Sequence, residues 1–176
     1  ATSYAYRGLG LIAQTLGEHQ QAVALFRQSL TMLTELGARQ DVARLLAELS
    51  RSLFALGDDA EAEHGWLVAL RLASATSGNF IMLEALVGLA ALQAKQGNQA
   101  RALAWSSLIL QHPAAIQATR QHAEQLQNEM IAQLTQQQVE TVQARVKTTT
   151  LETVIDELLQ QNSAAGEMVE SGRISI

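Results

Sequence analysis

The side chains in this sequence that could do chemistry are few and widely spaced. Its four histidines are His19, His64, His112 and His122. None lies four residues from another, which is the spacing that places two metal ligands on one face of a helix. Asp58 and Asp59 are neighbours, so on a helix they point apart and make a poor pair for acid–base catalysis. We therefore predict no catalytic residues, no metal site and no cofactor.

Glycine motifs, charge and hydropathy argue against several classes of ligand. Gly8 and Gly10 resemble the start of a dinucleotide-binding loop, but the third glycine and the preceding strand are missing. No phosphate-binding G-x-x-x-x-G-K-[ST] loop occurs, and a net charge of −5 gives no general attraction for nucleic acid. The longest apolar run, residues 85–92, is too short to span a membrane. We predict no direct contact with nucleic acid and none with a membrane.

The chain contains no cysteine, which excludes disulfides and thiolate chemistry and leaves the cellular compartment open. The N-terminus lacks the basic flank and apolar stretch of a signal peptide. We therefore expect a cytoplasmic location. Because the chain begins almost inside a predicted helix and without methionine, we also expect it to be a piece of a longer protein.

A six-residue turn motif recurs three times at a fixed step of forty residues. The copies are GEHQQA at 17–22, GDDAEA at 57–62 and GNQARA at 97–102. Good helix formers flank every copy, and the only proline of the chain is Pro113. A period of this size marks a repeat architecture, in which each unit buries its apolar face only against its neighbours. We predict an all-α fold built from three antiparallel helical hairpins.

The turn motif separates a first and a second helix in every unit. We expect first helices at 3–16, 41–56 and 80–96, and second helices at 19–36, 60–76 and 99–111. The repeat array then covers residues 1–135, with units at 3–40, 41–79 and 80–113 and a cap helix at 114–135. We expect short helices at 136–161 and a flexible tail at 162–176 to follow it. Asp58 and Asn98 follow a turn glycine at a position suited to helix capping. Thr149-x-x-Glu152 is typical of a capping box.

The first unit resembles the tetratricopeptide repeat, a family of helix–turn–helix units. The resemblance lies in Leu9, Gly10, Ala13, Gly17, Ala22, Phe26 and Ser29. Phe26 and Trp66 occupy the place of the family's large aromatic residue in the second helix, whereas the third unit has Ser106 there. The step of forty residues exceeds the family's usual length of about thirty-four. The resemblance implies a right-handed α-solenoid with C-terminal capping helices that binds a protein or peptide segment.

Units of this greater length resemble the C-terminal sensor regions of large bacterial signal-transduction ATPases that act as transcriptional regulators. Residues 144–154 also resemble the end of such proteins. This second resemblance implies a sensor module of a multidomain regulator, in which an occupied binding site biases the upstream domains.

In arrays of this family the first helices line the concave face and supply the ligand contacts. The contacts that we predict are Arg7, Leu11 and Gln14 in unit one, Arg44, Ala47, Arg51 and Phe54 in unit two, and Glu84, Val87, Ala91 and Ala94 in unit three. Arg7, Arg44 and Arg51 could together meet a carboxylate or an acidic peptide, because guanidinium groups pair with carboxylates bidentately. The alternative is that the arginines are solvated and Phe54 is partly buried.

Self-assembly is the alternative function. The first helix of this chain lacks a neighbour on its N-terminal side, so an apolar edge with Tyr4, Leu11 and Ile12 could pair with a second copy. This arrangement predicts a homodimer.

Overall fold

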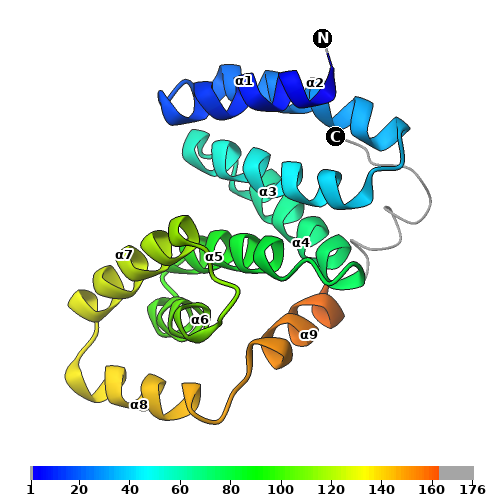
Figure 1. The fold of residues 1–176 in the computed structure, drawn as a ribbon. Helices are drawn as coiled ribbons and strands as arrows, with labels where there is room; N and C mark the ends of the chain where they lie inside the picture. The colour runs from blue at the N-terminus through cyan, green and yellow to red at the C-terminus, as the bar shows by residue number, and fades with distance from the viewer. Residues whose placement is uncertain (1, 163–176) are drawn as a thin grey trace.

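The computed structural model describes residues 2–162, and every regular element among them is an α-helix (Figure 1). The helices are α1 (Ser3–Thr15), α2 (His19–Glu35), α3 (Arg39–Leu56), α4 (Asp59–Ala75), α5 (Asn79–Lys95), α6 (Gln99–Gln111), α7 (Gln117–Gln133), α8 (Gln136–Val146) and α9 (Leu151–Gln161). The ends of the first six helices lie within two residues of the predicted ends.

The helical hairpins stack in a row, as α1 with α2, α3 with α4 and α5 with α6 (Figure 1). Helices α1, α3, α5 and α7 pack on one another in that order, and we call them the inner helices. We call α2, α4 and α6 the outer helices; among the described residues none of these three packs closely on another. Because the row is tighter on its inner side, it curves and the inner face is concave. The predicted all-α solenoid is confirmed.

The glycine of each turn motif has a left-handed backbone. Its φ angle is 79° at Gly17, 89° at Gly57 and 86° at Gly97. Glycine adopts this conformation without the steric penalty of a Cβ atom, which explains why every copy of the motif begins with it. The chain can therefore reverse direction within a few residues and lay the second helix against the first.

The residue after the glycine does not cap the next helix with its side chain. Asp58 and Asn98 stand at the N-cap positions of α4 and α6, as predicted, but neither makes a side-chain capping bond. The ψ angles of 62° and 56° differ from the extended backbone of a capping residue. Asn98 instead donates from Nδ2 to Gln93 Oε1 at 3.0 Å. The prediction of side-chain capping at these two positions is wrong.

The C-terminal caps also differ from the prediction. Thr150 caps α9, since its Oγ1 accepts a hydrogen bond from the backbone N–H of Thr153 at 3.2 Å. The prediction of a capping box from Thr149 and Glu152 is therefore wrong, because the N-cap lies one residue later and caps α9 with its own side chain alone. A capping box does form at the start of α8, where the side chains of Thr135 and Gln138 each bond the other residue's backbone N–H.

After the third hairpin, α7 continues the row of inner helices, and α8 and α9 turn back over the outer helices. Helix α7 packs on α5 and α6, α8 packs on α6, and α9 packs on α4 and α6 (Figure 1). Arg71 of α4 holds the end of α9 by donating to the carbonyl oxygens of Leu159 and Asn162, each at 3.4 Å. Asn162 thus has a defined contact, and the rest of the predicted flexible tail, residues 163–176, lies outside the described residues.

Glycines that face aromatic rings set the distance between helices. A Cβ atom added at Gly10 would lie 2.6 Å from the Phe26 ring, and one added at Gly88 would lie 2.1 Å from Cε2 of Trp66. Both rings are buried. Gly10 therefore lets α1 approach its own partner α2, whereas Gly88 lets α5 approach the preceding hairpin.

We predict that Gly88→Ala lowers the free energy of unfolding by about 1–3 kcal/mol, because the new methyl group overpacks against Trp66. Gly8 occupies the equivalent position in α1 and has no atom within 4 Å of an added Cβ. Gly8→Ala is the matched control and should raise stability by up to about 1 kcal/mol through helix propensity alone. Urea denaturation of both variants measures the difference, and equal effects would contradict the packing argument.

Candidate functional site

The eight side chains that head the predicted set of ligand contacts all lie on inner helices. Helix α1 carries Arg7, Leu11 and Gln14, α3 carries Arg44, Ala47, Arg51 and Phe54, and α5 carries Glu84. They do not form one open surface, because several of them join neighbouring units. Ala47 is only 2% exposed, and Leu11 packs against the core.

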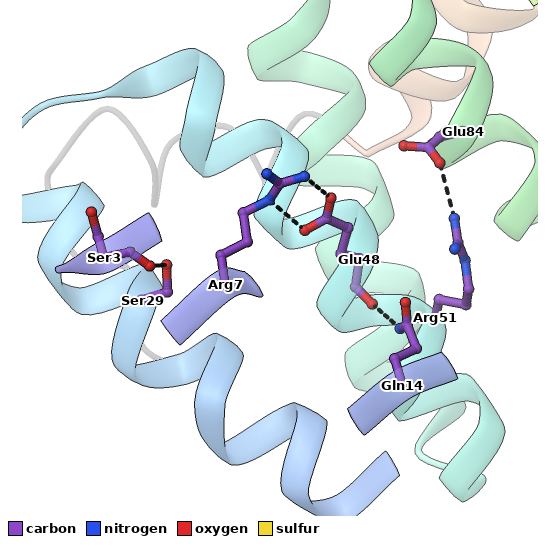
Figure 2. A network of polar contacts seen from close by, with 7 residues as sticks. All are labelled: Ser3, Arg7, Gln14, Ser29, Glu48, Arg51 and Glu84. Carbon is purple, nitrogen blue, oxygen red and sulfur yellow. Dashed lines mark hydrogen bonds and ion pairs between the residues drawn. The ribbon is translucent and has the colours of Figure 1, made fainter. Parts of the chain in front are cut away.

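Arg7, Gln14 and Glu48 connect α1 to α3, and we call them the α1–α3 clamp (Figure 2). Arg7 donates from Nε to Glu48 Oε2 at 2.8 Å and from Nη2 to Oε1, so the ion pair is bidentate. Gln14 Nε2 donates to the backbone carbonyl of Glu48 at 2.9 Å and to Ser52 Oγ at 2.8 Å. Two of the predicted ligand contacts therefore hold the first two units together.

Glu48 is the carboxylate that the clamp buries. It is 6% exposed as a residue, whereas the Arg7 side chain remains 23% exposed. Burial raises the pKa of Glu48, and the hydrogen bond and charge of Arg7 offset only part of that rise. The same hydrogen bond raises the pKa of Arg7. A buried carboxylate needs such a partner, because an unpaired charge in this place would be strongly destabilising.

The other two predicted arginines contact α5. Arg51 Nη2 donates to Glu84 Oε1 at 3.0 Å and forms an ion pair that is partly exposed (Figure 2). The guanidinium of Arg44 lies over the Phe80 ring, 5.0 Å from its centroid, in a cation–π contact. Each arginine thus has its own partner inside the array. Joint recognition of a carboxylate by the three arginines stays a prediction.

A pocket of about 230 Å³ opens on the concave side across α3, α5 and α7, and we call it the inner pocket. Its apolar lining is Phe54, Trp66, Val87, Gly88, Ala91 and Leu126. Its polar lining is Arg51, Glu84, His122, Gln125 and Glu129. Three of the eight predicted residues, Arg51, Phe54 and Glu84, therefore meet in the pocket with α7, and so do Val87 and Ala91 of the further positions in unit three.

The same repeat positions hold different residues between α1 and α3 and between α3 and α5. Equivalent positions are forty residues apart, so Arg7 corresponds to Ala47 and Glu48 corresponds to Gly88. Arg7 and Glu48 fill the space between α1 and α3. The equivalent pair between α3 and α5 is Ala47, which is buried, and Gly88, where the Trp66 ring occupies the space and lines the pocket. In unit three the equivalent of Arg7 is Val87, which has no charge to pair. Ala91, four residues later, contributes only a methyl group to the pocket lining.

The described structure has the architecture of a helical repeat array, and a comparison with protein families identifies the repeat. The family model of the tetratricopeptide repeat matches residues 1–64, which span α1, α2, α3 and the start of α4. Residues 1–64 therefore match the tetratricopeptide repeat family. Neither a curated protein nor a solved structure shows a significant match to it. Tetratricopeptide repeats generally mediate contacts between proteins, and they are scaffolds, not catalytic folds.

The repeats contain no grouping of side chains suited to metal chemistry. Within residues 2–162, no three histidine, aspartate or glutamate residues come together as metal ligands. No helix in that part of the chain has the length and hydropathy needed to cross a membrane.

Two charges of the inner pocket cancel and a third does not. Arg51 and Glu84 form an ion pair, whereas Glu129 accepts only a hydrogen bond from Gln125 Nε2, at 3.0 Å, among the described residues. Partial burial lowers the pKa of His122, and the positive charge of Arg51 lowers it further. With His122 neutral, the formal charges of the lining sum to −1 (Arg51 positive, Glu84 and Glu129 negative).

Helix α7 and the outer helix α4 also line the inner pocket, which the sequence did not predict. The sequence places Trp66 only at the position of the family's large aromatic residue, and it predicts only a cap for residues 114–135. A signal for α7 existed, because it begins at Gln117 and α5 begins at Asn79, a spacing close to the repeat length. Helix α7 therefore takes the place of a fourth first helix, and its inner side completes the pocket.

We predict that the free energy of unfolding of Glu48→Gln, taken relative to that of the unchanged protein, rises as the pH rises from about 4 to about 7. Because burial raises the pKa of Glu48, the folded state binds its proton more tightly than the unfolded state. The stability contributed by Glu48 is complete below the pKa of the unfolded state and is lost as the pH rises through the folded pKa. Glutamine has no such titration.

Urea denaturation of both proteins across this pH range measures the difference. Glu124→Gln, which removes an exposed carboxylate of α7, is the control for a change in net charge. A difference that shrinks as the pH rises would show that the Arg7 ion pair outweighs the burial of Glu48.

Proposed function

We propose that this chain binds a peptide or protein segment on its concave face, with the inner pocket as the main point of contact. The observation that supports the proposal is the contrast between the two ends of the inner face. The space between α1 and α3 is closed by the α1–α3 clamp, whereas the space across α3, α5 and α7 is open and mostly apolar. Concave apolar sites with a few polar groups are typical of ligand binding.

The proposal extends to the setting of the module. By its resemblance to the sensor regions of bacterial signal-transduction ATPases, the chain acts in the cytoplasm as part of a multidomain transcriptional regulator. Binding of the partner segment then shifts the other domains between two states, in proportion to the difference in affinity for those states. The chain itself contacts the partner and makes no direct contact with nucleic acid.

A selection of short random peptides displayed on phage against the purified chain tests the binding site. Peptides that bind the concave face should perturb the backbone amide NMR signals of Val87, Ala91 and Leu126. The signals of Arg27 and Thr31 on the outer helix α2 should stay unchanged. Selected peptides that perturb only outer helices, or a selection that yields no binder, would contradict the proposal.

We predict that Phe54→Ala weakens binding of a selected peptide by about tenfold or more, since truncating a central aromatic contact costs at least about 1–2 kcal/mol. The Phe54 ring lies 5.6 Å from the Trp66 ring in the pocket lining. Leu36→Ala is the control, because Leu36 is 74% exposed and lies outside the pocket. Isothermal calorimetry gives the affinities, and thermal unfolding shows that both variants are folded. Equal affinities for the two variants would refute the role of Phe54.

Self-assembly through α1 is the second candidate. Leu9 and Ile12 of α1 and Leu16, the residue that caps the end of α1, are 52%, 59% and 68% exposed. The equivalents of the first two in unit two, Leu49 and Ser52, are buried beneath the preceding hairpin. The exposed edge therefore includes Tyr4 and Ile12, as predicted, but not Leu11, which faces the core.

If this edge pairs with a second copy, the mass measured by light scattering should rise with protein concentration, and Ile12→Lys should abolish the rise. A charged side chain in an apolar interface is strongly unfavourable, whereas on the exposed surface of a monomer it changes little. A mass that stays at that of one chain over the whole concentration series would exclude self-assembly.

A further inference from the structure

We infer that the inner pocket recognises one large aliphatic or aromatic side chain that is followed in its peptide by a lysine or arginine. The apolar side chain occupies the pocket, and the basic side chain contacts Glu129. This inference rests on the proposed function and names the chemistry of the partner.

The size and lining of the pocket support a single apolar side chain. Its volume of about 230 Å³ lies below the range of about 300–1,000 Å³ that holds drug-sized molecules. The lining residues Phe54, Trp66 and Leu126 come from three different helices and present carbon atoms. Phe54 and Trp66 are held in place by contact with each other, so the site is already formed before the ligand arrives. A preformed apolar site binds a side chain with little loss of its own conformational freedom.

The charges at the pocket support a basic neighbour. Arg51 is neutralised by Glu84 at 3.0 Å, so it offers little net attraction to an acidic group. Glu129 is exposed and has no cationic partner among the described residues. A lysine or arginine next to the anchoring side chain would supply that partner, whereas an acidic residue there would be repelled.

The first two units show that this chemistry is specific to one part of the concave face. At the repeat position of Ala91, unit one has Leu11 and unit two has Arg51. Between α1 and α3 the negative charge of Glu48 is already paired with Arg7 and buried. Within the described residues, an open apolar site and an unpaired carboxylate therefore occur together on the concave face only where α7 joins the array. A peptide with an apolar residue and a basic neighbour can use both there.

Three short synthetic peptides, capped at both ends and with Gly and Ser flanks, test the inference by NMR titration of the whole chain. They carry Phe-Lys, Phe-Glu or Ala-Lys at the centre. The Phe-Lys peptide should perturb the signals of Val87, Ala91 and Leu126 and should bind about fivefold or more tightly than the Phe-Glu peptide. The Ala-Lys peptide should not perturb these signals. A Phe-Lys peptide that leaves them unchanged, or a Phe-Glu peptide that binds equally well, would overturn the inference.

Two variants locate the two contacts. Glu129→Gln should weaken the Phe-Lys peptide about fivefold and leave the Phe-Glu peptide no weaker, whereas the control Glu124→Gln, on the same helix but outside the pocket, should change neither affinity. Ala91→Leu should abolish binding of the Phe-Lys peptide by filling the pocket. Leu11 at the equivalent position of α1 shows that the helix tolerates this residue.

Failure of this inference can be told apart from failure of the proposed function. Peptides selected by phage display that bind the concave face but lack an apolar residue with a basic neighbour would refute the inference and leave the proposed function standing. Unchanged binding of the Phe-Lys peptide to both Ala91→Leu and Glu129→Gln would also refute it. Perturbation confined to Leu9 and Ile12 of α1 and to Leu16 would identify a different binding surface and refute both.

Discussion

The contact between the Trp66 ring and the backbone of Gly88 sets the spacing on which the inner face depends. Any side chain larger than hydrogen at position 88 would meet the ring, so α5 can lie close to the preceding hairpin only with glycine there. This close approach brings Glu84 within reach of Arg51 and leaves Trp66 in the lining of the inner pocket. A packing constraint therefore places both an ion pair and an apolar binding surface on the same side of the array.

The array uses the same repeat positions in two different ways. Between α1 and α3, Arg7 and Glu48 fill the space with a bidentate ion pair, and Gln14 adds hydrogen bonds to the backbone. Between α3 and α5 the equivalent residues are Ala47, which is buried, and Gly88, where the Trp66 ring occupies the space and forms part of the inner pocket. Buried ion pairs add little net stability but disfavour misaligned packing, so the clamp suits a part of the array that must hold a fixed register. The open part is free to contact a partner.

Local sequence signals predicted the helices well and the caps poorly. The turn glycines report a backbone conformation that depends on one residue, and the structure shows the left-handed φ angles at all three copies of the motif. Side-chain capping depends on the backbone conformation at the N-cap residue, which the residue type does not determine: ψ is 62° at Asp58 and 56° at Asn98, but 156° at Thr135. For that reason Asp58 and Asn98 occupy capping positions without capping, whereas Thr135 and Gln138 form a capping box. The outer helix residue Trp66 and the helix α7 entered the site only through packing.

The sequence by itself determined the all-α architecture, the order of the hairpins and the inner helices that carry the candidate residues. These properties follow from helix periodicity, turn glycines and the forty-residue step, all of which act over short stretches of chain. Only the tertiary structure decided which arginines are paired and where the concave face is open. Arg7 meets Glu48 across 41 positions, and Phe54 shares a pocket with Leu126 of α7. Such pairs depend on the distance between whole helices, which is set by the combined packing of many side chains and not by the residues of either helix alone.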